Sequence, residues 1–391
     1  MNRRHFIEVC GVLGITAPSL AFTSTNKKER GETVLIIGAG AAGLTAGYLL
    51  KQQGVSFRIV EASSGYGGRM KRTKSFVDFP ISLGAEWLHV QTKTLDGIAD
   101  GMSAAMDPYL EGYSGREVVG YYEDGNLEYA PLSDAFGKGF ADKKFVNASW
   151  FDFFETYVIP EVRDDIQFDT QIASINYQGN RVQIYDTLGT DYAASHVIVT
   201  APLQVLQQGG ISFVPELPDY KQRAMQDAPV WGGIKVFIEF SKQFYPTYLA
   251  FPDSETKQGQ RLYYDAAYAQ NTRTNVLGLF AVGAQARVYQ SLSGADQLAY
   301  ILSELDEVFG GEATRCYKQH IIQDWDQEPF IHCAYLADGA SSYISSDLFS
   351  PIDETVHFAG EAYTDEGDWG SVHNAAQSAR DVVATIVCCN D

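Results

Sequence analysis

A glycine-rich turn between a short apolar segment and a helix constrains this 391-residue chain more than any other feature. The β-branched apolar run Thr33–Ile37 predicts a buried strand, and Gly38 opens a helix of small residues and leucines that reaches Leu50. Ser56–Val60 predicts the next strand. This order is a β-α-β unit, and it predicts the start of a doubly wound parallel sheet in an α/β fold.

The residues of this turn match a dinucleotide-binding pattern. Glycines in a turn that opens a helix let backbone amides approach a pyrophosphate where the helix dipole favours negative charge. Glu61 ends the second strand, where its carboxylate can accept the hydroxyl groups of an adenosine ribose. The cofactor-binding candidates of this unit are Gly38, Gly40, Ala41, Ala42, Gly43, Glu61 and Ala62. The pattern alone leaves both FAD and NAD open.

The charge balance of the chain is strongly acidic. Lys and Arg number 29 against 49 for Asp and Glu, which gives a formal net charge of -20. Such a chain does not neutralise phosphate backbones, so nucleic acid is not an expected partner. The acidity fits either simple solubility or long-range attraction of cationic substrates.

Residues 1–24 are typical of an export signal. Arg3, Arg4 and Phe6 precede a short apolar stretch, Val9–Leu20. The arginine pair is similar to a twin-arginine signal, which exports proteins already folded around a cofactor. The stretch contains Pro18 and is shorter than the about 20 apolar residues of a membrane-spanning helix. We therefore expect a periplasmic or secreted bacterial protein without a stable membrane span.

The cysteines that would remain after removal of the export signal predict no metal site. They are Cys316, Cys333, Cys388 and Cys389, and they form neither a CxxC pair nor a Cys/His pattern. A disulfide between two of them is compatible with an oxidising compartment, but the spacing selects no pair.

Strand and helix patterns along the chain predict two domains, of which the first is discontinuous. Its later strands are predicted at Ile172–Tyr177, Arg181–Tyr185, His196–Thr200 and Thr355–Phe358, and its last helix at Val372–Ile386. The second domain has strands at Ile234–Phe240, Arg261–Tyr264 and Val276–Val282 and a helix at Ala295–Phe309. We assign residues 32–90, 164–206 and 350–391 to a Rossmann-like cofactor domain, and 91–163 and 207–349 to an α+β substrate domain. The aromatic run Trp150–Phe154 is predicted to be core.

Further motifs occur in a fixed order along the chain. They are Gly67-Gly68-Arg69, Gly84-Ala85-Glu86-Trp87-Leu88-His89, Val197–Leu203, Lys235, Trp325–Tyr335, Phe358–Ala362 and Val372–Ala375. Together they resemble the flavin-containing amine oxidase family, which includes monoamine oxidases, polyamine oxidases and L-amino acid oxidases. The resemblance implies FAD as the cofactor, a small-molecule amine or amino acid as the substrate and molecular oxygen as the acceptor.

The resemblance also implies roles for individual residues toward FAD. Arg69 would contact the pyrophosphate or flavin region, Glu361 the ribityl and phosphate chain, and the backbone of Ile172 the adenine. The helix that begins near Val372 would direct its N-terminus at the pyrimidine edge of the flavin, where it stabilises negative charge. The implied contacts are Gly67, Gly68, Arg69, Gly84, Ala85, Glu86, Trp87, Ile172, Trp325, Gly360, Glu361, Ser371 and Val372.

Four residues are catalytic candidates. Lys235 lies in an apolar strand, so its ammonium group is expected to face solvent or a cavity, and the family lysine at this position holds a water near flavin N5. Tyr335 would form one wall of an amine-orienting cage. Ser371 falls where monoamine oxidases carry the opposite aromatic wall, so Trp369 is the candidate substitute. His89 falls where polyamine oxidases have a His or Glu near the substrate.

Two departures from the family pattern affect cofactor attachment and substrate size. Monoamine oxidases carry their flavin-linked cysteine where this chain has Ala334, so non-covalent FAD is expected, although the adjacent Cys333 and His332 leave a covalent link open. Family members usually insert a long helical section before the adenine-contacting strand. Only residues 90–171 occupy that place here, so the helical part of the substrate domain is expected to be short.

The resulting expectation is an FAD-dependent oxidase of a primary or secondary amine that releases hydrogen peroxide. An L-amino acid oxidase is an alternative, because a cation could grip the substrate carboxylate. The candidate cations in the substrate domain are Arg261, Arg273, Arg287 and Arg315. A second alternative is a protein that uses FAD for electron transfer without oxidase turnover.

Overall fold

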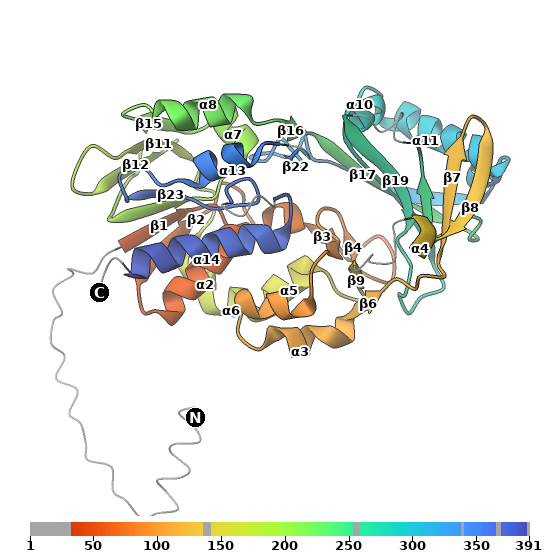
Figure 1. Cartoon of the computed structure of the whole chain (residues 1–391), viewed down its shortest axis with the longest axis horizontal. Coiled ribbons are helices and arrows are strands. Elements are labelled where there is room, and N and C mark those ends of the chain that lie inside the picture. Colours follow the sequence, from red (N-terminus) through yellow and green to blue (C-terminus); the bar gives the residue numbers. More distant parts are fainter. Residues whose placement is uncertain (1–32, 136–141, 253–257, 338–339, 365–368, 389–391) are drawn as a thin grey trace, which may run out of the picture. The chain divides into compact units, whose positions relative to one another are not determined.

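The computed structural model describes residues 33–135, 142–252, 258–337, 340–364 and 369–388 (Figure 1). They belong to the unit that begins at Glu32. The predicted export signal with Arg3 and Arg4 lies outside the described residues, as does Cys389, and the signal stays a prediction. Within the described part of the chain, no helix combines the length and apolar character that crossing a membrane requires.

A five-stranded parallel sheet forms the centre of the cofactor domain. Its order is β10 (Ile166–Gln167), β2 (Ser56–Val60), β1 (Thr33–Ile37), β14 (His196–Val199) and β23 (Val356–Phe358). These strands come from four separate stretches of sequence. The predicted Rossmann-like sheet, discontinuous along the chain, is therefore confirmed.

The central strand β1 is buried on both faces, which explains its continuous apolar run. Val34 and Ile36 face α2 (Ala41–Gln52) and α14 (Val372–Cys388), because successive side chains in a strand point to opposite faces. The two helices lie side by side along the sheet (Figure 1). Leu35 and Ile37 face a second cluster on the other side.

That second cluster is covered by a smaller sheet and short helices. The sheet has the order β13 (Asp191–Ala194), β12 (Val182–Asp186), β11 (Ile172–Asn176) and β15 (Ser212–Val214). The helices are α7 (Leu203–Gln207), α8 (Asp219–Asp227) and α13 (Ser342–Phe349). The strands predicted at 172–177 and 181–185 therefore exist, but they belong to this separate sheet and not to the parallel one.

The substrate domain contains a seven-stranded sheet. Its order is β21 (Tyr317–Asp324), β17 (Gly233–Phe240), β20 (Asn275–Gly283), β19 (Gly259–Asp265), β18 (Tyr248–Ala250), β7 (Val118–Glu123) and β8 (Asn126–Pro131). The helices α10 (Ala284–Gln290), α11 (Gly294–Phe309) and α12 (Glu312–Cys316) follow β20. Every residue of β17 is buried, because the strand lies between β20 and β21 and its two faces pack into separate apolar clusters, one with Val236 and the other with Phe237.

The remaining α-helices and strands are short and lie between the strands of these three sheets along the chain. They are β3 (Arg72–Thr73), β4 (Ile81–Ser82), β5 (Trp87–Leu88), α3 (Met102–Met106), β6 (Leu110–Gly112), α4 (Leu132–Ala135), β9 (Lys143–Phe145), α5 (Trp150–Tyr157), α6 (Ile159–Val162), β16 (Val230–Trp231) and β22 (Tyr335–Leu336). Trp150, Phe153 and Phe154 are buried, as predicted. They pack in one cluster with α2 and the parallel sheet.

A buried lysine joins α8 to α13. The Lys221 Nζ donates to the carbonyl oxygens of Asp347 at 2.9 Å and Leu348 at 2.7 Å, in the last turn of α13. It also lies 4.0 Å from the centroid of the Phe358 ring. Burial lowers the pKa of Lys221 to about 7, and the charge of Asp347 only partly opposes this.

The lowered pKa of Lys221 makes stability depend on pH. From about pH 7 to pH 10 the unfolded chain binds this proton and the folded chain does not, so raising the pH stabilises the fold. We expect the unfolding free energy of the wild type to rise by about 1.4 kcal/mol per pH unit relative to Lys221→Met. Urea unfolding with FAD in fixed excess measures this, with the exposed Lys51→Met as the control. A difference that stays constant with pH would contradict the prediction.

Candidate active site

A cavity of about 950 Å³ lies where loops that follow the strands of the parallel sheet meet β17, β19 and β20. Its volume is at the upper end of the about 300–1,000 Å³ typical of small-molecule sites. Ligands of open parallel sheets bind outside the carboxyl ends of the strands, where these loops lie. Of the four catalytic candidates and the expected non-covalent cofactor contacts, all except Gly43 line this cavity. The candidates therefore share one site, and their individual roles stay predictions.

The turn between β1 and α2 presents its backbone to the cavity. Gly38 has φ +111°, and a Cβ on Gly40 would meet no atom within 4 Å, because this position opens into the cavity. A Cβ on Gly43 would lie 1.9 Å from the Gly38 carbonyl oxygen. Gly43 thus allows α2 to pack close to β1, whereas Gly40 leaves room for a ligand at the N-terminus of the helix. This arrangement fits the pyrophosphate of FAD.

Glu61 is fixed at the end of β2 by three donors. Its Oε2 accepts a hydrogen bond from the Ala39 amide at 2.6 Å, and its Oε1 accepts from the Ser63 amide at 2.9 Å and the Ser63 hydroxyl at 2.7 Å. Glu61 and Ile172 both line the cavity. A held carboxylate has further lone pairs for ribose hydroxyls and would repel a 2'-phosphate, so this end of the cavity fits the adenosine half of FAD.

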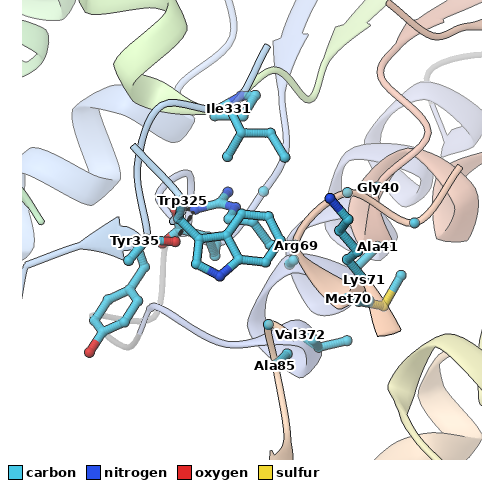
Figure 2. Close-up of a pocket in the computed structure, with 18 of the residues that line it drawn as sticks. Gly40, Ala41, Arg69, Met70, Lys71, Ala85, Trp325, Ile331, Tyr335 and Val372 are labelled. Atoms are coloured by element: carbon cyan, nitrogen blue, oxygen red, sulfur yellow. Dashed lines mark hydrogen bonds and ion pairs between the residues drawn. The ribbon is translucent and has the colours of Figure 1, made fainter. Parts of the chain in front are cut away.

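Arg69 and Glu361 form an ion pair that ties three segments together. The Arg69 Nη1 lies 2.8 Å from Glu361 Oε1 and donates to the Ala334 carbonyl oxygen at 2.7 Å. Glu361 Oε2 accepts from the Leu336 amide at 3.2 Å. In Figure 2, Arg69 lies behind the ring of Trp325, and both are among the residues that line the cavity. The pair therefore holds the wall that carries Trp325 and Tyr335.

Lys235 is held in place on the cavity wall. It is only 3% exposed, and its Nζ donates to Glu86 Oε2 at 2.8 Å and to the Ser82 carbonyl oxygen at 3.4 Å. Burial lowers the pKa of Lys235, Glu86 opposes this shift, and the nearby Lys144 adds to it. Of the two predicted environments, solvent and cavity, the structure therefore shows the cavity.

The carboxylate of Glu86, predicted as a cofactor contact, has three protein partners. Besides Lys235, its Oε1 lies 3.4 Å from Lys144 Nζ, and its Oε2 accepts a hydrogen bond from the Tyr264 hydroxyl. Burial on its own raises the pKa of Glu86, but Lys235 and Lys144 together lower it. Glu86 therefore stays ionised between the two lysines. Lys144 and Tyr264 lie outside the sequence motifs and were therefore not predicted as site residues.

Aromatic side chains form much of the substrate part of the cavity. Lys235 Nζ lies 5.1 Å from the centroid of the Trp87 ring. Tyr335 packs edge-to-face against Trp231 with centroids 6.0 Å apart, and the Trp369 Nε1 donates to the Ala337 carbonyl oxygen at 3.2 Å. Tyr335 and Trp369 both line the cavity, as the predicted cage requires, but Trp231 behind Tyr335 was not predicted.

Some residues of β19 and β20 also line the cavity, although they lie outside the sequence motifs. Leu262 on β19 lies directly opposite Phe280 on β20, and both line the cavity together with Gln260. Because residues i and i+2 of a strand share a face, the Arg261 side chain points to the other face, where it pairs with Glu304 at 2.6 Å. The alternation of side chains along β19 could be predicted from the sequence, but the sequence did not indicate which face of the strand lines the cavity.

His89 lies beside the carboxylate of Asp142, a residue that was not predicted from the sequence as part of the site. Its Nδ1 lies 2.9 Å from Asp142 Oδ2, and its side chain is 48% exposed. Both residues line the cavity. The Asp142 side chain is 23% exposed, so this part of the wall presents a partly covered carboxylate.

The N-terminus of α14 reaches the cavity. Ser371 precedes the helix, and its hydroxyl accepts a hydrogen bond from the Asn374 amide at 3.2 Å, as an N-cap does. Ser371, Val372, His373 and Asn374 line the cavity. The positive end of the helix dipole is thus available to developing negative charge on a ligand.

The two residues that left a covalent flavin link open do not line the cavity. Cys333 is buried, and burial raises the pKa of its thiol to about 11. His332 is half-buried beside it and has a left-handed backbone with φ +60°. Because the thiolate is the nucleophilic form of cysteine, this environment does not activate Cys333.

Comparison with known families and proteins agrees with this geometry. The model of the flavin containing amine oxidoreductase family matches residues 155–387, and that of an NAD(P)-binding Rossmann-like domain matches residues 36–97. Lysine-specific histone demethylase 2 of Homo sapiens is 25% identical over 93% of this chain and 54% of its own length. Polyamine oxidase 2 of Arabidopsis thaliana is 24% identical over 89% of this chain and 86% of its own. The chain spans about half the length of the histone demethylases that it matches.

Solved structures show the same fold. Cyclohexylamine oxidase from Brevibacterium oxydans IH-35A has a TM-score of 0.75 at 16% identity, over 92% of this chain and 99% of that chain. Putrescine oxidase bound to putrescine has a TM-score of 0.73 at 16% identity, with the same coverage. The family match, residues 155–387, covers more than half of the 391 residues and confirms the resemblance found in the motifs. The chain therefore belongs to the flavin-containing amine oxidoreductase family, and its cofactor is FAD.

Proposed function

We propose that this chain is an FAD-dependent oxidase of a primary or secondary amine. A primary amine, oxygen and water would give an aldehyde or ketone, ammonia and hydrogen peroxide through a hydrolysed imine. FAD, which the turn after β1 and Glu61 would hold, would supply the acceptor for the two electrons that leave the amine carbon and their donor to oxygen. The observation that carries the proposal is the buried Lys235 on the wall of an aromatic cavity that also contains the dinucleotide cradle.

The cavity walls would prepare the amine for oxidation. An alkyl ammonium group has a pKa near that of lysine, about 10.4, and lacks the lone pair that drives hydride loss. Apolar and aromatic surroundings disfavour the charged form, so entry into the cavity lowers the pKa of the amine. Trp87, Phe280 and Tyr335 supply these surroundings and restrict the orientation of the substrate.

The charges of the site and of the chain favour a cationic molecule on approach. Asp142 presents its carboxylate to the cavity beside His89, and the chain carries a net charge of -20. Acidic surfaces raise the local concentration of cations and so their association rate. An amine would therefore be captured in its charged form and lose its proton deeper in the cavity.

The alternative of an L-amino acid oxidase has less support in the geometry. None of the four arginines that could grip a carboxylate, Arg261, Arg273, Arg287 and Arg315, lines the cavity. Among the described residues, the arginines that do line it are already paired: Arg69 with Glu361 at 2.8 Å, and Arg72 with Asp152 at 3.1 Å and Glu155 at 2.6 Å. A substrate carboxylate would thus have to compete with protein carboxylates.

Peroxide release from matched substrates tests the proposal. Cadaverine and L-lysine, or putrescine and L-ornithine, differ by one carboxylate. We expect peroxide from an amine, and at least about tenfold lower kcat/KM for its carboxylated partner, because burying an unpaired carboxylate costs more than about 1.4 kcal/mol. Preference for the amino acids would instead establish the alternative. Yellow protein that accepts electrons from an amine but forms no peroxide would establish an electron-transfer flavoprotein.

A further inference from the structure

Two buried lysines share a single carboxylate beside the cavity. Lys235 Nζ lies 2.8 Å from Glu86 Oε2, and Lys144 Nζ lies 3.4 Å from Glu86 Oε1. All three side chains are almost fully buried. With both lysines protonated, these three side chains carry a net charge of +1 in the protein interior, which the nearby Asp265 offsets on the side of Lys144. Such a charge is costly, so one of the two ammonium groups is under pressure to lose its proton.

Among the described residues, the other groups around this cluster add no second negative charge next to Lys235. Tyr264 donates its hydroxyl to Glu86, and burial first of all raises the pKa of this phenol and of the neighbouring Tyr113 and Tyr248, which keeps them neutral. The rings of Trp87 and Phe237 lie over Lys235. In the described part of the chain, a further carboxylate that acts on the cluster is that of Asp265, and it acts on Lys144.

The two lysines differ in their acceptors. Lys144 Nζ donates to the carbonyl oxygens of Ala266 at 2.6 Å and Asp265 at 3.1 Å, in addition to its contact with Glu86. Lys235 has Glu86 and, more distantly, the Ser82 carbonyl at 3.4 Å. Lys235 also lines the cavity, whereas Lys144 does not. When the cluster loses a proton, Lys235 is thus the lysine that loses it, and the cavity is where the proton goes.

We propose that Lys144 is a positioning residue for Lys235. The two ammonium groups compete for the Glu86 carboxylate, so Lys144 makes the proton on Lys235 exchangeable with the cavity. Lys235 then meets the bound amine, or the water beside it, as a neutral amine able to accept a proton. This role rests on the proposed amine oxidation, but the arrangement of charges that produces it is a property of the chain itself.

The test is a titration of the Lys235 Nζ in the FAD-bound enzyme. Lysine labelled with 15N reports its protonation by NMR, and Lys235→Met assigns the signal. We expect Lys144→Gln, which keeps a donor toward the carbonyls, to move the midpoint about one pH unit or more upward, because it removes a like charge. Glu86→Gln should move the midpoint downward, because it removes the opposite charge. The pH profile of kcat should shift in the same directions.

Two control variants separate this role from a structural one. Lys143→Gln removes a charge from the adjacent position of β9, where Lys143 donates to Thr92 and not to Glu86, and it should leave the midpoint unchanged. Lys144→Arg retains the charge and should restore the wild-type midpoint. A midpoint that does not respond to Lys144→Gln, or shifts equally in Lys143→Gln, overturns the proposal. If Lys144→Gln does not fold, an unchanged or raised midpoint in Glu86→Gln overturns it.

The titration also distinguishes this proposal from that of amine oxidation. The NMR midpoints are measured without substrate, so they test the cluster even if no amine is turned over. Absence of turnover with shifted midpoints would refute the oxidase function and leave the electrostatic coupling established. Turnover of an amine with unshifted midpoints would establish the oxidase function and refute the electrostatic coupling of Lys144 to Lys235.

Discussion

Replacing Lys235 with methionine should slow reduction of the enzyme by amine, or its reoxidation by oxygen, by about 100-fold or more, and should leave FAD bound. The side chain lies on the cavity wall, and a positioned acid or base contributes about 10²–10⁴-fold to a rate. Methionine has a similar volume, and Glu86 keeps Lys144 and Tyr264 as partners, so the site should not collapse. Stopped-flow absorbance of the flavin, without oxygen and then with it, measures the two steps separately.

The control for this prediction is a lysine of comparable burial outside the cavity. Lys221→Met removes a buried lysine amine between α8 and α13, and Lys221 does not line the cavity, so both rates should stay near those of the wild type. The flavin content of each purified variant, taken from its visible absorbance, shows whether the cofactor site is intact. Unchanged rates of both reduction and reoxidation in Lys235→Met would rule out a catalytic role for this lysine.

The parts of the site that could be predicted from sequence are those that depend on local backbone geometry. The turn from Gly38 to Gly43 has the same form in the structure as in the pattern, because only glycine allows the close contact of α2 with β1 and leaves Gly40 open. Buried strands such as Thr33–Ile37 were predicted for a similar reason, since a parallel sheet covered on both faces requires a continuous apolar run.

The parts that could not be predicted depend on contacts between distant segments. Glu86 and Lys235 are separated by 149 positions and meet because the loop after β4 packs against β17. The pattern around Glu86 indicated a cofactor contact, and no feature of the sequence indicated Lys144 as its other partner. The same holds for Asp142 beside His89, since the choice of partner depends on tertiary packing and not on spacing along the chain.

Gly40→Val should weaken FAD binding about 10- to 100-fold, equivalent to about 1–3 kcal/mol, while the protein remains folded. Gly40 has φ -82° and ψ -169°, an extended conformation that valine adopts readily. A Cβ here would meet no other protein atom within 4 Å, and the valine side chain that it begins would project into the cavity where the pyrophosphate must approach the backbone amides. Titration of the apoprotein with FAD, followed by flavin fluorescence, gives the affinity.

Gly43→Ala tests the opposite expectation on the same turn. Its Cβ would lie 1.9 Å from the Gly38 carbonyl oxygen, a backbone atom that cannot move unless α2 shifts away from β1. We therefore expect this smaller substitution to lower the unfolding free energy of the apoprotein by about 1–3 kcal/mol, whereas Gly40→Val leaves it nearly unchanged. Urea unfolding of both apoproteins separates the two effects. The two glycines make room for different neighbours: Gly40 for the pyrophosphate and Gly43 for the Gly38 carbonyl oxygen. Wild-type FAD affinity in Gly40→Val would therefore show that the pyrophosphate does not lie against this turn.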